Sequence, residues 1–582
     1  MVWDHVYDPL GSPLLSTLVA MLPLVVLLGL LAGCGWSAQR AAIAGLLTAL
    51  GVAVGVVGMP LDAAAAATLY GACFGLFPIG WIIVTAMFLY SLSVEAGALD
   101  VMKRSVTRLS ADHRIQALLI AFAFGAFLEG AAGFGAPVAI SAALLTGAGF
   151  PPFEAACLAL IANTAPVAFG ALGTPIITLA KVTGLEEQAI SAMAGRQLPF
   201  FSLIVPAWMV VTMAGWKGLV GVWPAVLVCG ASFALVQAGE ANLVGPALVD
   251  VVGGLVSLAC LAAFMRVWQP RDCWRYGAAE MPSPATGPEA LDSPARIVWA
   301  WMPWVFLSLA VFAWGLPVVK AGLEAKPGSA LADVVPIAIV APEFPVPRLH
   351  KAVAKVAPAT DHVRELEPAI YRLNWLSAAG TGILLAALVA IPWLGIAPGR
   401  AWRIWGENLS RLAGPLVTFA AMLALAFVTR YSGTDVILGL AMTRTGPAYP
   451  LFAALLGWLG VALTGSDTSS NAMFGSLQRV TAGQLGLDPL LICTANSTGG
   501  VMGKMIDAQS IVVAATATGI DRQEGAILRR VFPHSLALAV LVGLLVWLQT
   551  GPLAWMVPAH EPPRGLWFGG VAADGCTDIR SR

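Results

Sequence analysis

Charged residues are scarce in this sequence. Asp, Glu, Lys and Arg make up 11% of the 582 residues, whereas hydrophobic residues make up 58%. A soluble chain carries about 25% charged residues, so the composition excludes an ordinary soluble protein. Acidic and basic residues balance at 32 each. The absence of net charge gives no indication of nucleic acid or another polyanion as a partner.

Motifs typical of enzymes and metal sites are missing as well. The sequence has no Gly-x-Ser-x-Gly elbow, no His-Glu-x-x-His motif and no P-loop. Its six histidines show no pair with metal-ligand spacing, and its eight cysteines include no Cys-x-x-Cys pair. We therefore expect neither an enzyme nor a bound cofactor or metal. The cysteines are interpreted as small packing residues.

Long apolar runs, in contrast, are abundant. They recur from Leu14 to Leu548 between short polar breaks. Because a bilayer core takes about 20 apolar residues per helix, this pattern predicts an all-α polytopic membrane protein with about 12 to 14 transmembrane helices. The first run lacks the basic flank of a signal peptide. Acidic residues near the start and a basic cluster at 100–114 predict an outside N-terminus and a cytoplasmic loop at 100–114.

Three segments fall outside the apolar pattern. Residues 266–296 form a polar loop, and residues 317–372 form an extramembrane segment that is too rich in proline for a spanning helix and that we expect to cap one face. The tail at 551–582 lacks a sustained apolar run, so we expect it to be poorly ordered. These segments divide one transmembrane domain, 1–582, into a first half at 1–265 and a second half at 373–550.

The two halves resemble each other in the order of their polar residues. Glu129 in "FLEGAAGFGAP" is followed by Asn163 in an Ala-Asn-Thr triplet. Asp467 in "GSDTSSN" is followed, at a similar separation, by Asn496 in an Ala-Asn-Ser triplet. A Gly-rich break comes next in each half. We interpret the segments at about 115–185 and 455–520 as two structural repeats with broken or re-entrant helices, with a binding site at their interface.

Broken helices inside a membrane expose backbone N–H groups and a positive dipole end, both of which attract anions. We therefore expect a small carboxylate to bind there. The candidate substrate-binding residues carry amide, hydroxyl or cationic side chains: Asn163, Thr164, Arg196, Asn496, Ser497, Thr498 and Lys504. The alternatives are capping of a broken helix for the asparagines, close helix packing for the small hydroxyl residues, and a helix-end position at the membrane surface for Arg196.

Glu129 and Asp467 are candidates for proton coupling. A charged carboxylate at a helix centre costs about 2.5–3.5 kcal/mol on insertion scales, and binding a proton removes this cost. The alternative is a permanent ion pair with a buried cation such as Lys504 or Arg196. Sodium is also an alternative coupling ion, because oxygens of Thr468, Ser469 and Asn471 lie close to Asp467 in the sequence. Further candidates for ion binding or support of the site are Ser470, Asn471, Asp507 and Gln509.

Several long segments resemble the lactate permease family of bacterial membrane carriers. They run from Tyr7 to about Val513 and include "YGACFGLFPIGWIIVTAMFLYSLSVEAG", "GAFLEGAAGFGAP", "LIANTAPVAFGALGTPI", "GRQLPF", "LLGWLGVALTGSDTSSNAMFGSLQ" and "ANSTGGVMGKMI". The resemblance implies uptake of L-lactate, and often of D-lactate and glycolate, by proton symport across the bacterial cytoplasmic (inner) membrane. A sodium-coupled carboxylate symporter is the nearest alternative, and a monocarboxylate channel or a sensor is a less favoured one.

Two positions depart from the family pattern. The chain has Asp507-Ala508 where family members usually have Ser-Pro, and Ala136 where they have Thr. The first departure adds an acid three residues from Lys504, with which it can pair, and so weakens the case for Lys504 as the partner of a substrate carboxylate. The second departure removes a hydroxyl group. Both bear on substrate preference more than on transport itself.

Overall fold

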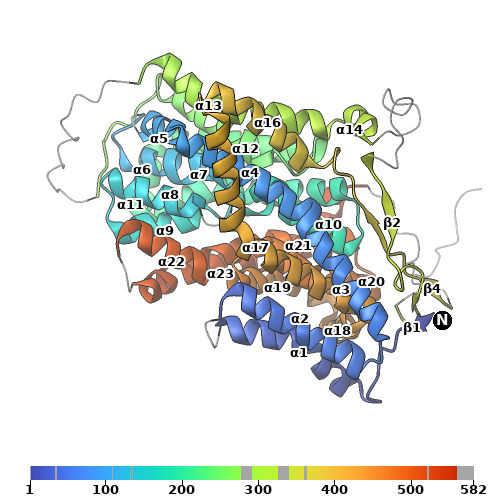
Figure 1. Cartoon of the computed structure of the whole chain (residues 1–582). Coiled ribbons are helices and arrows are strands. Elements are labelled where there is room, and N and C mark those ends of the chain that lie inside the picture. The colour runs from blue at the N-terminus through green and yellow to red at the C-terminus, as the bar shows by residue number, and fades with distance from the viewer. Residues whose placement is uncertain are drawn as a thin grey trace, which may run out of the picture.

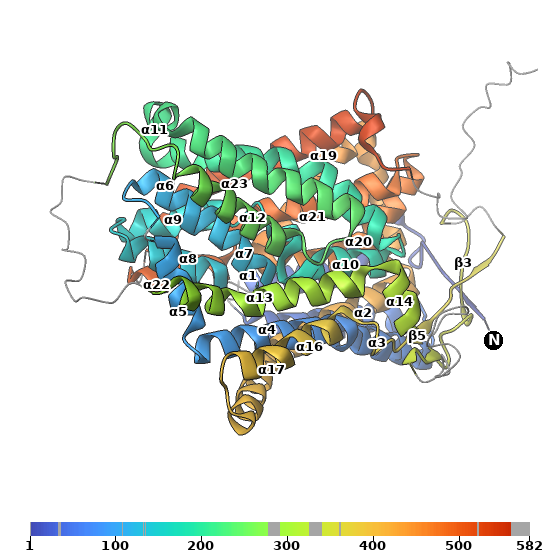
Figure 2. The same ribbon diagram turned by 90° about the horizontal axis from the view of Figure 1, so that it is seen from above.

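The computed structural model describes residues 2–32, 36–107, 109–131, 133, 136–276, 292–324, 340–359, 363–520 and 523–559. Helices dominate this part of the chain, and most of them run between the same two ends of the molecule (Figure 1). The view turned by 90° shows the same arrangement (Figure 2). The expectation of a polytopic, all-α membrane protein is confirmed.

The bounds of the helical elements follow the apolar runs. The first half contains α1 (Pro13–Ala32), α2 (Ala38–Gly55), α3 (Leu61–Phe74), η1 (Gly75–Gly80), α4 (Trp81–Glu95), α5 (Ala98–Thr107), α6 (His113–Ala117), η2 (Leu118–Phe124), α7 (Gly125–Ala131), α8 (Ala136–Gly147), α9 (Pro152–Ala162), η3 (Val167–Phe169), α10 (Gly170–Thr183), α11 (Glu187–Leu243) and α12 (Val249–Phe264). The remainder contains α13 (Pro294–Gly315), α14 (Pro317–Leu323), α16 (Ala379–Trp393), α17 (Pro398–Ser432), α18 (Thr434–Met442), η4 (Thr443–Ala448), α19 (Tyr449–Thr464), α20 (Asp467–Gln484), α21 (Pro489–Gly503), η5 (Lys504–Ile506), α22 (Ala508–Thr518), α23 (Glu524–Gln549) and η6 (Ala554–Met556).

The number of helices that can cross a membrane differs from the sequence count. Within the described residues, seven helices are long and apolar enough, or eight if the bent pair α9 and α10 is one span. The apolar runs led us to expect about 12 to 14. The difference arises because α12, α16 and other apolar helices are shorter than a full span. In addition, the 57-residue α11 runs through a break at Gly215, whose φ is 66°, so two apolar runs form one element.

Helices are broken where the sequence predicts breaks. α9 and α10 meet at a bend of 64°. At the start of α10, Ala171 and Leu172 adopt left-handed φ values of 44° and 58°, and Gly173 follows with 74°. Residues other than glycine are strained in this region and keep it only when surrounding contacts hold them. In the second half, α21 ends at Gly503, η5 follows, and α22 begins at Ala508.

Each broken segment packs on a helix of the other half. α10 packs against α20, and α22 packs against α8 and α9. α10 also contacts α7 and α21, and α21 contacts α20. The interior therefore holds a junction of α7, α10, α20 and α21, which are the elements that carry most of the candidate site residues.

Short strands cover one end of the helices. β1 (Trp3–Asp4) pairs in parallel with β3 (Val353–Lys355), which pairs antiparallel with β4 (Glu365–Leu366). β2 (Glu343–Pro345) pairs antiparallel with β5 (Ile370–Arg372). Both views place these strands and the N-terminus at the same end, opposite α5 (Figures 1 and 2). Parts of the segments that we expected to be extramembrane or poorly ordered lie outside the described residues: 277–291, 325–339, 360–362 and 560–582.

Glu367 links this strand region to the helices through ion pairs. Its buried carboxylate pairs with Lys355 of β3 and, at 3.2 Å, with Nη2 of Arg430 in α17. Arg430 also donates to the carbonyl of Val182 in the last turn of α10, at 3.2 Å. Burial disfavours a charged carboxylate here, but Arg430 and Lys355 outweigh it and lower the pKa of Glu367 to about 2. The Glu367 ion pairs therefore persist throughout the neutral pH range.

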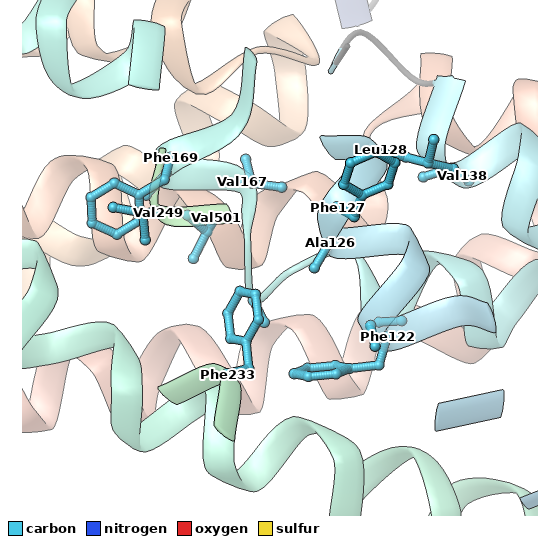
Figure 3. Packing of buried hydrophobic residues seen from close by; sticks show 14 of the residues in the cluster. Phe122, Ala126, Phe127, Leu128, Val138, Val167, Phe169, Phe233, Val249 and Val501 are labelled. Carbon is cyan, nitrogen blue, oxygen red and sulfur yellow. The ribbon is translucent and has the colours of Figure 1, made fainter. Parts of the chain in front are cut away.

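An apolar cluster surrounds the junction of broken helices. Figure 3 shows part of it, with labelled side chains from η2, α7, α8, η3, α11, α12 and α21: Phe122, Ala126, Phe127, Leu128, Val138, Val167, Phe169, Phe233, Val249 and Val501. α7 and α12 approach closely, since a Cβ built at Gly254 would lie only 2.5 Å from the backbone nitrogen of Phe127. This packing leaves little room for water beside α7, so polar groups there lie in a low-dielectric environment.

Candidate functional site

Glu129 lies in α7 and is buried, with 4% of its surface exposed. Its Oε1 packs against Gly170 at the start of α10, where an added Cβ would lie 2.7 Å from that oxygen. The side chain of Asn163, the C-cap residue of α9, lies near the same carboxyl group. Within the described residues, neither Glu129 Oε2 nor the Asn163 amide has a well-oriented hydrogen-bond partner. Glu129 and Asn163, the two polar residues singled out in the first half, therefore lie close together and retain free hydrogen-bonding capacity.

Asp467 opens α20 and is 3% exposed. Ser497 Oγ donates to Asp467 Oδ2 at 2.5 Å, and Asn471 Nδ2 donates to the same oxygen at 3.3 Å. The other oxygen, Oδ1, packs against Gly500, where an added Cβ would lie 2.3 Å away. Each acid thus rests on a glycine of the broken segment in its own half, Glu129 on Gly170 and Asp467 on Gly500.

A network of side-chain amides joins the two broken segments. Asn471 Nδ2 donates to the carbonyl of Pro175 in α10 at 3.1 Å, and Asn496 Nδ2 donates to Asn471 Oδ1 at 2.8 Å. Gln478 Nε2 in turn donates to Asn496 Oδ1 at 3.0 Å. Asn471 and Asn496, both singled out from the sequence, are therefore direct partners. Sequence reasoning missed Gln478, because nothing in its neighbourhood along the chain distinguishes it from a surface glutamine.

Lys504 supplies positive charge to both acids. Within the described residues, it is the basic side chain that interacts electrostatically with both Glu129 and Asp467. Its Nζ donates to the carbonyl of Gly465 at 2.6 Å and lies 3.2 Å from Asp507 Oδ2. Only 7% of the Lys504 side chain is exposed. A buried ammonium group beside buried carboxyls is a suitable counter-charge for an anionic ligand.

Asp507 has two structural roles. Its Oδ1 accepts a hydrogen bond from the backbone nitrogen of Ser510 at 2.9 Å and so caps α22, while its Oδ2 faces Lys504. Asp and Ser are both favourable N-cap residues. The exchange of Ser for Asp therefore preserves the cap and adds a charge beside Lys504, as we expected. Gln509 follows on the exposed side, close to Gly465. The side chain of Ala136, the other departure, lies outside the described residues.

The remaining candidates differ in where their side chains are engaged. Thr498 Oγ1 donates to Gln197 Oε1 at 2.7 Å, which ties α21 to α11. Thr164 and Ser470 donate to backbone carbonyls. Arg196 binds Asn242 Oδ1 at 3.0 Å and the carbonyl of Met556 at 2.9 Å. These contacts direct Arg196 away from the acids, so the junction draws its positive charge from Lys504.

One further buried acid was not selected from the sequence. Asp250, in the first turn of α12, has no exposed surface, and neither of its carboxyl oxygens has a hydrogen-bond partner among the described residues. Its neighbour across the helix contact is α7, where a Cβ built at Gly130 would lie 2.7 Å from Asp250 Cβ. The available signal was an acid with apolar residues on both sides, "LVDVVGG", the same kind of signal that revealed Glu129.

The junction thus collects more acids than bases. Glu129, Asp467, Asp507 and Asp250 are all buried, and Lys504 is the cation linked to the first three. Several uncompensated charges in a dry interior are too costly to persist, so carboxyl groups in such a place bind protons or cations. The unpartnered polar atoms of Glu129, Asn163 and Asp467 can accept or donate to a small ligand. This chemistry fits binding and release of an anion together with a proton.

Comparison with known proteins identifies relatives of this chain. The family described as L-lactate permease matches residues 16–551. An L-lactate permease of Salmonella typhimurium is 45% identical over 560 residues, covering 96% of this chain and all of that protein. An L-lactate permease of Bacillus subtilis is 43% identical over 574 residues with the same coverage. The glycolate permease GlcA of Escherichia coli is 44% identical over 558 residues, covering 94% of this chain and 98% of that protein.

Among solved structures, the YdaH transporter of Alcanivorax borkumensis aligns with 84% of this chain and 89% of its own. The sequence identity is 15% and the TM-score is 0.43, which is too remote a likeness to support a conclusion about fold or function.

Proposed function

Because the chain belongs to the L-lactate permease family, we propose that it carries L-lactate and related 2-hydroxy monocarboxylates into the cell by proton symport. The related substrates include D-lactate and glycolate. Members of this family are transporters and not enzymes. The membrane is the bacterial cytoplasmic membrane, with the N-terminus outside. No cofactor takes part, and the proton is the coupling ion. Relatives named for lactate and for glycolate support this choice of substrates.

The observation that carries the proposal is the excess of buried acids over Lys504 at the junction of broken helices. When a lactate carboxylate pairs with Lys504, Glu129 and Asp467 lose their shared counter-charge. A carboxylate left without it in a low-dielectric site is stabilised by taking up a proton. Binding of the anion and binding of the proton therefore support each other, and the loaded site carries no additional charge, which favours its passage through the membrane.

The other side chains have supporting roles in this proposal. The Asn163 amide, whose polar atoms lack well-oriented partners, binds the substrate hydroxyl or carboxylate. The network of Asn471, Asn496 and Gln478 links α10 to α20 and α21. We propose that the two segments at about 115–185 and 455–520 are the structural repeats that move against each other during alternating access.

Sodium coupling is the nearest alternative. A sodium ion at Asp467 needs free oxygen acceptors, yet Ser497 and Asn471 direct their donors at Asp467 Oδ2, and Asn471 Oδ1 already accepts from Asn496. This pattern of donors favours a carboxyl group that exchanges a proton over a coordinated cation.

Uptake of labelled lactate into proteoliposomes tests the proposal. An inward proton gradient is expected to drive accumulation above equilibrium, equally with and without sodium. Accumulation that follows a sodium gradient and ignores pH would overturn proton coupling. Equilibration without accumulation under either gradient would indicate a channel. Absence of any lactate flux would indicate a sensor and not a transporter. Competition by both lactate enantiomers, glycolate and pyruvate then defines the substrate range.

A further inference from the structure

Asp250 belongs to the same buried region as Glu129 but has none of its partners. Glu129 has Lys504 and Asn163 acting on it. For Asp250, both carboxyl oxygens lack a hydrogen-bond partner within the described residues, and the charged group that acts on it there is Glu129. An isolated carboxylate with a like charge as its neighbour is unstable in a dry interior. Asp250 is therefore expected to hold a proton while Glu129 is charged.

Glycine contacts keep Asp250 at the junction. The Cα of Gly130, next to Glu129, lies directly against Asp250, because an added Cβ would come within 2.7 Å of both Asp250 Cβ and Val251 N. Just before α12, Pro246 packs in the same way on Gly173, where an added Cβ would lie 2.7 Å from the carbonyl carbon of Pro246. The start of α12 is thus wedged between α7 and the strained beginning of α10, both of which carry the glycine-rich breaks of the first half.

Among the described residues, the helices packed against Asp250 supply no competing counter-charge. α12 packs chiefly against α11, α7, η2 and α10. Of these, α7 supplies Glu129, and η2 consists of apolar residues. On α11, Arg196 is engaged by Asn242 and Met556. Within the described residues, the ionisable groups of α10 and α11 do not act on Asp250.

We propose that Asp250 and Glu129 form a proton relay, in which Asp250 hands its proton to Glu129 when the substrate anion takes Lys504. The O–H bond of the Asp250 carboxyl breaks, an O–H bond forms on the Glu129 carboxylate, and Asp250 then recovers a proton from water. One proton enters per lactate anion. This inference rests on the proposed proton symport and adds to it the residue that supplies the proton.

The relay is tested with purified protein in liposomes that contain a pH-sensitive dye. In the wild type, lactate addition is expected to cause proton entry. Asp250→Asn is expected to slow lactate-dependent proton entry by about a hundredfold or more, the lower end of the range for a lost proton-transfer group, while exchange of labelled for unlabelled lactate continues. Asp250→Glu restores a carboxyl group and is expected to restore proton entry. Glu240→Gln, at a partly buried acid of α11 with no contact to Glu129 among the described interactions, is the matched control and is expected to behave as wild type.

The outcomes separate this inference from the proposed function. Absence of lactate-dependent proton entry in the wild type would disprove proton symport itself. Normal proton entry in Asp250→Asn would disprove only the relay. Loss of both exchange and proton entry in Asp250→Asn, without recovery in Asp250→Glu, would show that Asp250 serves packing alone and would also overturn the relay.

Discussion

Lys504 Nζ lies 3.2 Å from Asp507 Oδ2 inside the protein, three residues along the chain and across the break between α21 and α22. The Asp507 side chain is 1% exposed, so water screens this pair little. Asp507 occupies the position that an incoming carboxylate would take beside the ammonium group. The chain thus carries its own competitor for the substrate's counter-charge.

Replacing Asp507 by Ser should strengthen substrate binding. Serine also caps α22, so the helix is retained, and Lys504 loses the carboxylate that occupies it. A hydrogen bond to a charged group contributes ~1.5–3 kcal/mol, so the apparent KM for lactate is expected to fall by about tenfold. Initial rates of labelled lactate uptake give this value. Asp488→Ser, the equivalent cap exchange at the far end of α21, is the control and should leave KM unchanged. An unchanged KM in Asp507→Ser would assign Lys504 a structural role.

Glu129→Gln should separate exchange from accumulation. The amide matches the shape of the protonated acid but cannot release a proton, so the variant is expected to lose accumulation under an inward proton gradient and to retain lactate exchange. Both are measured in the same proteoliposomes, with and without the gradient. Full accumulation by Glu129→Gln would remove Glu129 from proton coupling and leave Asp467 as the remaining predicted carrier.

The acids of the site could be predicted from sequence for a simple reason. A carboxylate in an apolar run is costly wherever the run folds, so Glu129 and Asp467 stand out without any knowledge of their neighbours. The breaks at Gly170–Gly173 and after Gly503 could also be predicted, because glycine and proline act locally on the backbone. The membrane class and the broken helices followed from these local rules.

Partners distant in sequence could not be predicted in this way. Arg196 was a candidate substrate ligand, and the sequence did not indicate its partners in the structure, which are Asn242 and the carbonyl of Met556, 360 residues further along the chain. The role of Gln478 became visible only when its neighbours were known, whereas Asp250 carried a sequence signal that was overlooked. The helix bounds were hard to predict for a related reason: apolar length indicates a crossing, whereas packing decides whether neighbouring runs form one long helix or two short ones.

The glycines beneath the two acids offer a test of the repeat. An alanine Cβ would lie 2.7 Å from Glu129 Oε1 at position 170 and 2.3 Å from Asp467 Oδ1 at position 500. Gly170 has φ −61°, which alanine adopts readily, so Gly170→Ala should displace the carboxyl rather than unfold the protein. We expect Gly170→Ala and Gly500→Ala each to reduce proton-driven uptake by about tenfold or more, since overpacking of this kind costs about 1–3 kcal/mol.

Gly51→Ala is the control for these variants, because a Cβ there has nothing within 4 Å. It should transport at the wild-type rate. Thermal unfolding of the three purified variants shows whether a loss of uptake reflects misfolding. If Gly170→Ala and Gly500→Ala transport normally, the contact of each acid with its glycine is incidental, and the correspondence between the two halves loses this support.

The ion pairs of Glu367 should dominate the stability of the strand region. Glu367→Gln leaves Lys355 and Arg430 without their carboxylate, and breaking a buried ion pair costs about 3–5 kcal/mol. Burial opposes the charged form, but the nearby cations outweigh it and lower the pKa of Glu367 to about 2. The contribution of Glu367 to stability is therefore fully present above the ordinary glutamate pKa of about 4.3 and is lost as the pH falls toward 2.

The difference in Tm between wild type and Glu367→Gln in detergent should therefore be constant from pH 8 to about pH 5 and shrink below that. Glu365→Gln, two residues away in β4, should show no comparable difference, and an equal loss in both variants would attribute the effect to the strand and not to the ion pairs.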